Sequence, residues 1–218
     1  MQRIRTCSQL EEAVERTGIL PFFKNRVAGW SLAEAIDPAV WFTSEEGPWE
    51  WKGQLAAGRR CVYGKFIGGK AAFVSPDCFG ELMNLRRGGL SFEERLEEGL
   101  IPFNDKRLMD YLLAHPNVLS RHAKRECGLV KGFDAALTRL QMGTDVILCD
   151  FRYSFDKTGK PYGWGNAALD LPERWFGAGF FALPQERSPE ASEDCLTRRI
   201  LGALPGLDET ALRRALRA

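Results

Sequence analysis

The sequence predicts an α+β fold: two related halves built of short helices and a β-hairpin, followed by C-terminal helices. Three observations support this. Residues 104–175 have the pattern of three helices followed by a hairpin. A helix followed by a hairpin also occurs around 48–74. The last segments of the chain carry leucines at helical spacing. Three helices followed by a hairpin with a basic tip is the order of a winged helix-turn-helix, which often binds duplex DNA. We therefore expect tandem winged-helix-like modules.

The expected divisions follow from this pattern. Residues 1–102 form an N-terminal helical module with a β-hairpin, residues 103–176 form the winged helix-turn-helix module, and residues 177–218 form a helical extension that packs on the body. The boundary near 102–104 is neither long nor polar enough to be a free linker.

Composition agrees with a globular protein and bounds its partners. Hydrophobic residues make up 44% and charged residues 27% of 218 residues, enough for a sizeable core. The net charge of +1 is lower than that of a typical dedicated nucleic-acid protein. The charge is uneven, because residues 103–160 carry 10 basic and 7 acidic side chains. The positive excess therefore falls on the segment expected to contact DNA.

Cysteine spacing and the lack of long apolar runs predict a cytoplasmic, reduced protein. The six cysteines form no C-x-x-C motif, no secretory leader is present, and no apolar run approaches the roughly 18 residues of a membrane span. We expect mostly buried free thiols, no membrane association, no metal and no cofactor. Gly64, Gly68 and Gly69 match no phosphate-binding loop.

In the first half, capping patterns predict the helices. Ser8-Gln9-Leu10-Glu11 is a capping box for a helix over 9–17, which Gly18 ends. Residues 19–23 are expected to be an apolar connector. A second capping box at Ser31 opens a short helix, and Pro48 begins a third that ends by Gly58.

Two strand-like runs follow, over 60–66 and 70–74, and Gly68-Gly69 between them predicts a hairpin. Ser75-Pro76 then starts a helix that runs to about Asn84. A capping box at Ser91 introduces an acidic helix that ends at Gly99.

In the second half, Asp105 is expected to cap a helix that Pro116 stops, and Ser120 to cap a helix over 121–127. The next helix spans 133–142, and Phe133, Leu137 and Leu140 share its buried face.

Strands over 146–149 and 162–169 complete this half, with a turn at 156–160 and a short helix or turn at 171–175. Ser188 and Asp208 are expected to cap two final helices, over 189–203 and 209–217. Such amphipathic helices pack on the body or on a second copy of the chain, so a homodimer through them is a possible assembly.

The winged-helix interpretation assigns a DNA-contacting face. The helix over 133–142 would enter the major groove, where arginine and glutamine read base edges, while the preceding helix and the hairpin tip contact phosphates. The expected DNA-binding residues are Arg121, Lys124, Arg125, Lys131, Thr138, Arg139, Gln141, Lys157 and Lys160. The alternative is that these charges are an ordinary solvated face, and Asp134 on the same helix would repel phosphate.

Catalytic patterns are sparse. His115 and His122 have no partner spacing of a triad or a metal site, so we interpret both as structural. Glu45, Glu46 and Glu50 lie near two tryptophans, and burial against an aromatic ring suits acid–base catalysis. The alternative is that these acids mark a helix N-terminus, where the helix dipole favours them.

Four motifs resemble an uncharacterised bacterial protein family. The similarity covers about residues 45–176, and its motifs are Gly47-Pro48-Trp49-Glu50-Trp51, Tyr63-Gly64-Lys65-Phe66 with Gly69-Lys70-Ala71, the run 137–142, and Gly159-Lys160-Pro161-Tyr162-Gly163-Trp164. That family is distantly related to the AlkZ-type DNA glycosylases. The resemblance implies tandem winged helices, DNA as a partner and base excision as an activity.

One feature departs from the glycosylase pattern. Those enzymes share a Gln-x-Gln or Gln-x-Asp motif that positions the hydrolytic water, and no glutamine here has glutamine or aspartate two positions later. No catalytic residue carries over. Three hypotheses follow: non-enzymatic duplex DNA binding, a diverged glycosylase that uses Glu46 or Glu50, and a protein-interaction module assembled through the C-terminal helices.

Overall fold

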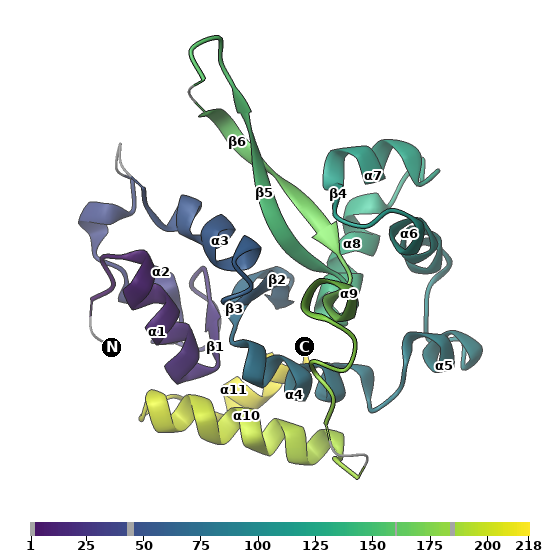
Figure 1. Ribbon diagram of the computed structural model, residues 1–218. Coiled ribbons are helices and arrows are strands. Elements are labelled where there is room, and N and C mark those ends of the chain that lie inside the picture. The colour runs from purple at the N-terminus through teal and green to yellow at the C-terminus, as the bar shows by residue number, and fades with distance from the viewer. Residues whose placement is uncertain (1–2, 43–45, 160, 184–185) are drawn as a thin grey trace.

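The computed structural model describes residues 3–42, 46–159, 161–183 and 186–218, without the side chains of 161–164. It has a mixed α+β architecture (Figure 1). The first half contains α1 (Cys7–Thr17), β1 (Ile19–Pro21), α2 (Leu32–Ala35), the 3-10 helix η1 (Pro38–Val40), α3 (Pro48–Ala57), β2 (Val62–Ile67) and β3 (Lys70–Val74).

Two helices, α4 (Pro76–Arg87) and α5 (Phe92–Glu97), connect the halves. The second half contains α6 (Phe103–Ala114), β4 (Val118–Leu119), α7 (Ser120–Glu126), α8 (Phe133–Met142), β5 (Ile147–Phe155), β6 (Pro161–Asp170) and α9 (Pro172–Phe176). The chain then forms α10 (Pro189–Ala203) and α11 (Glu209–Arg217).

The two halves have the same order of elements and the same sheet topology. Apart from the 3-10 helix η1 of the first half, each runs helix, strand, helix, helix, strand, strand. Each forms an antiparallel three-stranded sheet, ordered β1-β3-β2 in the first half and β4-β6-β5 in the second. In both sheets the last strand is central. Sequence patterns predicted the hairpins but missed β1 and β4, because strands of three and two residues show no hydrophobic alternation.

In both halves, the connection from the third helix to the hairpin has the same backbone conformation and the same hydrogen bonds. Gly58 and Gly143 both end their helix at φ −74° and ψ 0°. The residues that follow, Arg59 and Thr144, both adopt a left-handed conformation, with φ of 56° and 63°. Their amides donate to the carbonyls of Ala56 and Gln141. This strained turn is uncommon for residues other than glycine, so its occurrence at both connections marks a structural repeat.

Several predicted caps are confirmed. Ser91 and Glu94 form the reciprocal capping box of α5, and the side chains of Ser188 and Asp208 accept from the first turns of α10 and α11. Ser31 and Gly47 are the N-caps of α2 and α3.

Three predicted caps are wrong. Thr6, not Ser8, caps α1, because the hydroxyl of Thr6 accepts from the amide of Gln9. Asp105 lies inside α6, where it is buried and binds Arg139. The N-cap of α7 is Leu119, and Ser120 is already helical.

Each half places its third helix against the hairpin of the other half. Helix α3 packs on β5, α8 packs on β2, and β2 also contacts β5 (Figure 1). Gly53 lies at the first contact, where a Cβ would lie 3.4 Å from the Phe151 side chain. In the second contact the amide of Lys65 donates to Gln141 Oε1 at 2.9 Å. The interface is therefore reciprocal.

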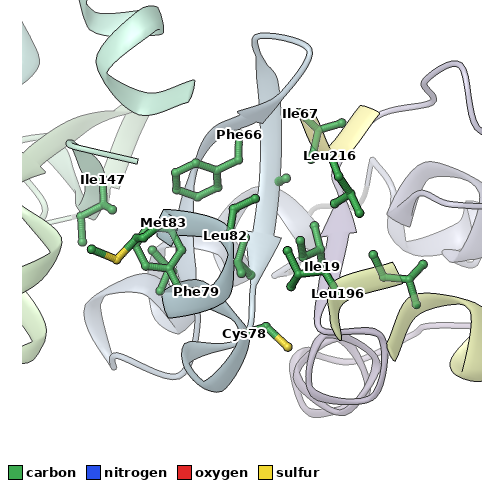
Figure 2. Close-up of a cluster of buried hydrophobic side chains, with 14 of the residues drawn as sticks. Ile19, Phe66, Ile67, Cys78, Phe79, Leu82, Met83, Ile147, Leu196 and Leu216 are labelled. Carbon is green, nitrogen blue, oxygen red and sulfur yellow. The ribbon is translucent and has the colours of Figure 1, made fainter. Parts of the chain in front are cut away.

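A shared hydrophobic core joins the halves to the C-terminal helices. Ile19, Phe66, Ile147, Leu196 and Leu216 belong to one buried cluster (Figure 2). Helix α10 lies along α4 and also contacts α1, and α11 packs on α4 and α10. The apolar faces of α10 and α11 are thus covered within the same chain.

Arg86 lies where the core, α8 and α11 meet. Its guanidinium donates to the carbonyl of Phe66 at 2.9 Å, to that of Ala215 at 3.3 Å, to that of Met142 at 3.4 Å, and to that of Ala218. Burial lowers the pKa of Arg86 to about 10, so it stays protonated at neutral pH. A charged donor thereby satisfies carbonyls at the C-terminal ends of two helices, where the helix dipole is negative.

Within the described ranges, all six cysteines are free thiols, and four of them are buried, as the sequence predicted. No helix among these residues is long and apolar enough to cross a membrane.

We expect Arg86→Ala to lower the free energy of unfolding by about 3 kcal/mol, because it leaves buried carbonyls without a donor. Urea denaturation measures this loss. The matched control is Arg214→Ala on the exposed side of α11, which should change stability by no more than about 0.5 kcal/mol. Equal effects of the two variants would contradict the role given to Arg86.

Candidate nucleic-acid interface

The predicted basic residues of α7 and of the loop before α8 lie at the surface. Arg121, Lys124, Arg125 and Lys131 are all exposed. Lys124 Nζ pairs with Asp134 at 2.6 Å and Arg125 pairs with Glu126 at 2.5 Å. Such exposed pairs contribute little energy and exchange readily. Among the residues that the structure describes, Arg121 and Lys131 form no ion pair.

The acid beside Arg125 belongs to a small polar network. The Glu126 carboxylate accepts from Arg125 and from the hydroxyl of Tyr111 at 2.9 Å, and these hydrogen bonds lower its pKa. The ring of Tyr111 stacks on His115 at 4.1 Å. The His115 Nδ1 lies 2.8 Å from the Tyr111 carbonyl, which agrees with a structural histidine at the end of α6.

The C-terminal half of α8 is engaged within the protein. Arg139 makes a two-pronged hydrogen-bonded pair with the buried Asp105, which raises the pKa of the guanidinium. Gln141 is only 1% exposed and accepts from the Lys65 amide. Thr138 accepts from Lys65 Nζ at 3.2 Å. Two of the three predicted DNA-binding side chains of α8, Thr138 and Gln141, therefore bind the first half of the chain.

The second hairpin projects away from the body, whereas the first is docked. Strands β5 and β6 extend beyond the rest of the molecule (Figure 1). Lys157 is exposed in the turn, which the Asp156 carboxylate shapes by accepting from Thr158. Predicted Lys160 lies outside the described residues. In the first hairpin, by contrast, Gly69 approaches Thr138 and Met142 of α8.

The two acids considered for catalysis act as structural groups at the start of α3. The Glu50 carboxylate accepts from the amide of the N-cap residue Gly47 at 2.9 Å. Glu46 accepts from the side chain of Gln54 at 2.8 Å. Glu45 lies outside the described residues. The alternative interpretation, an acid at a helix N-terminus, explains the contact of Glu50.

No group of three or more histidine, cysteine or acidic side chains suited to a metal ion occurs in the described part of the chain. His122 is partly buried on α7.

Sequence reasoning missed an aromatic and basic group at the junction of the halves. Lys52 of α3 lies over the Trp49 ring, 5.2 Å from its centroid, and over the Phe151 ring, 4.7 Å from its centroid. Tyr63 contacts Phe151 edge-on at 5.8 Å. The spacing of Lys52 along α3 gave no signal, because its partner Phe151 comes from the other half.

A protein-family model described as "AlkZ related" matches residues 4–217. The match covers both halves and the C-terminal helices, well beyond the segment 45–176 that carried the resemblance in sequence. Neither the curated proteins nor the solved structures contain a match to the chain.

We expect Gln141→Ala to destabilise the protein by about 2 kcal/mol, because the Lys65 amide loses its acceptor inside the interface between the halves. Thermal or urea unfolding measures this. Gln54→Ala is the matched control, since it removes only an exposed hydrogen bond to Glu46 and should cost about 0.5 kcal/mol or less. If Gln141→Ala kept full stability and lost only affinity for a ligand, Gln141 would instead be a reading residue.

Proposed function

The chain belongs to the AlkZ-related family, and we propose that it binds duplex DNA. In this proposal the third helix of each half does not read the base sequence. Exposed cations on α7, in the loop before α8 and at the β5–β6 turn support the proposal. The carrying observation is that Arg121, Lys131 and Lys157 are exposed and form no ion pair among the described residues. These are properties of phosphate contacts.

We further propose that each half is a winged helix. The order helix, strand, helix, helix, strand, strand and the central position of the last strand support this in both halves. In such a module α3 and α8 are the third helices, and the hairpins β2–β3 and β5–β6 are the wings.

The packing of these helices argues for an unusual mode of contact. Helix α8 directs Thr138 and Gln141 at β2, so these two side chains are not available to a major groove. The start of α8, helix α7 and the projecting wing remain exposed on the side of the molecule opposite α10 and α11 (Figure 1). These elements would contact DNA phosphates rather than base edges. Binding would therefore depend on the shape and charge of the duplex more than on its base sequence.

The remaining predicted cations play secondary parts in this proposal. Lys124 and Arg125 become phosphate contacts when their exposed ion pairs exchange. Arg139 stays with Asp105. Lys160 follows Lys157 in the sequence of the turn and is proposed to act with it.

Two alternatives receive less support. Base excision through Glu46 or Glu50 is disfavoured because the Glu50 carboxylate accepts from the Gly47 amide and the Glu46 carboxylate accepts from the Gln54 side chain. Assembly through the C-terminal helices is disfavoured because α10 and α11 bury their apolar residues against α4 and each other.

Binding of a fluorescent random-sequence duplex across a salt series tests the proposal. We expect affinity to fall steeply with salt, and the triple variant Arg121→Ala, Lys131→Ala, Lys157→Ala to reduce the slope of log K against log salt by roughly 3. Each lost phosphate contact removes about one released counterion.

The matched control replaces three exposed arginines on other faces, Arg16, Arg198 and Arg214, and keeps the same net charge as the first variant. It should retain most of the affinity and the slope. A duplex affinity that is absent at low salt, or that both triple variants weaken equally, would overturn the proposed surface.

A further inference from the structure

Strand β5 carries aromatic side chains at every second position from the body of the protein to the tip of its hairpin. The Phe151 ring meets Tyr63 edge-on at 5.8 Å, where β5 contacts the first half. Tyr153 is partly buried on the same side of the hairpin, because a Cβ on Gly165 would lie 3.0 Å from its ring and 3.2 Å from Phe151 Cβ. Phe155 continues this alternation and is 64% exposed. The outermost ring of the series is therefore presented to solvent.

The turn that follows Phe155 is closed by its own hydrogen bonds. The Gly159 amide donates to the Asp156 carbonyl at 3.0 Å, and Gly159 has a φ of 80°. The Asp156 carboxylate accepts from the Thr158 amide at 2.8 Å and from the Thr158 hydroxyl at 2.7 Å, whereas Lys157 is exposed. A preformed turn has little conformational entropy left to lose on binding, so the ring and the cation are presented together.

Position distinguishes Phe155 from other exposed phenylalanines. Phe103 begins α6, and Phe180 follows α9, so both lie on the body of the protein. Phe155 lies on the hairpin that projects from the body (Figure 1), two residues before Lys157, which is proposed to contact phosphate. A single exposed apolar residue is ordinary on a protein surface. One that lies beside a phosphate contact on a projecting hairpin is placed to meet the bases.

We infer that Phe155 is a wedge that enters the minor groove of duplex DNA and separates two stacked base pairs. The inference rests on the proposed duplex binding and adds a contact to the bases. Apolar side chains such as phenylalanine that insert from the minor groove unstack a base step and kink the duplex. Lys157 then contacts the phosphate beside the opened step, which holds the ring in place.

A wedge gives selectivity for the deformability of the duplex. Unstacking a paired step costs free energy, which burial of the Phe155 ring between the bases offsets only in part. A mismatched pair has already lost part of its stacking and pairing, so the cost is smaller there. The preferred partner is therefore a duplex with a weakened base step, whatever the surrounding sequence.

Two duplexes of one sequence, one fully paired and one with a central mismatch, test the inference on the full chain. A 2-aminopurine beside the mismatch fluoresces more strongly when its neighbours no longer stack on it. We expect the wild-type chain to bind the mismatched duplex roughly tenfold more tightly and to raise this fluorescence. Phe155→Ala should bind both duplexes equally, without the rise in fluorescence, and should keep the salt slope because Lys157 is unchanged.

Two further variants serve as controls, and urea unfolding of each variant checks its fold. Phe155→Leu should restore most of the preference for the mismatch, because leucine also inserts between base steps. Phe180→Ala is the matched control. Phe180 is 55% exposed and lines a cavity with Arg199 of α10, which lies on the side of the molecule opposite the hairpin (Figure 1). This variant should behave like the wild type.

The outcomes separate the wedge from the proposed function. Equal affinity of the wild type for the two duplexes, or a mismatch preference that Phe155→Ala retains, would overturn the wedge and leave duplex binding in place. A preference that Phe180→Ala abolishes equally would overturn the wedge as well. If neither duplex binds at low salt, the proposed function is wrong and the wedge fails with it.

Discussion

The buried guanidinium of Arg86 is the interaction on which the assembly of this protein depends. It forms no ion pair with an aspartate or glutamate among the described residues and is surrounded instead by main-chain oxygens from β2, α8, α11 and the α11 C-cap Ala218. Burying a charge without such acceptors is expensive, so the three elements must end at the same point for the fold to be stable. Arg86 thus links the first sheet, the second half and the C-terminal helices at one position.

Local sequence signals predicted much of the fold and little of the contact between the two halves. Capping residues such as Ser91, Ser188 and Asp208 act within one turn of their own helix, so their role is legible without tertiary structure. The strands β1 and β4 depend on pairing with distant strands, and their few residues carry no periodic pattern. The internal repeat is equally hidden, because Arg59 and Thr144 share a conformation but not a side chain.

The candidate site shows the same limit. Helical periodicity correctly separated the buried face of α8, with Phe133, Leu137 and Leu140, from the opposite face. It had no means to show that β2 covers part of that opposite face, which is why Gln141 is buried rather than available to a ligand. The sequence did not predict the aromatic surroundings of Lys52 for a related reason, since one of the two rings beside its ammonium group belongs to Phe151, a residue far away in the sequence.

The shared core has a consequence for how the chain folds as it is made. Ile19 and Val62 from the first half lie in one cluster with Leu196, Leu212 and Leu216. On a ribosome, which synthesises from the N-terminus, the first sheet emerges long before α10 and α11 exist to cover its apolar face. A domain that has been synthesised without part of its core exposes apolar surface, so it binds chaperones or aggregates. The core cluster that the first half shares with α10 and α11 is therefore completed only after the last helices have been synthesised.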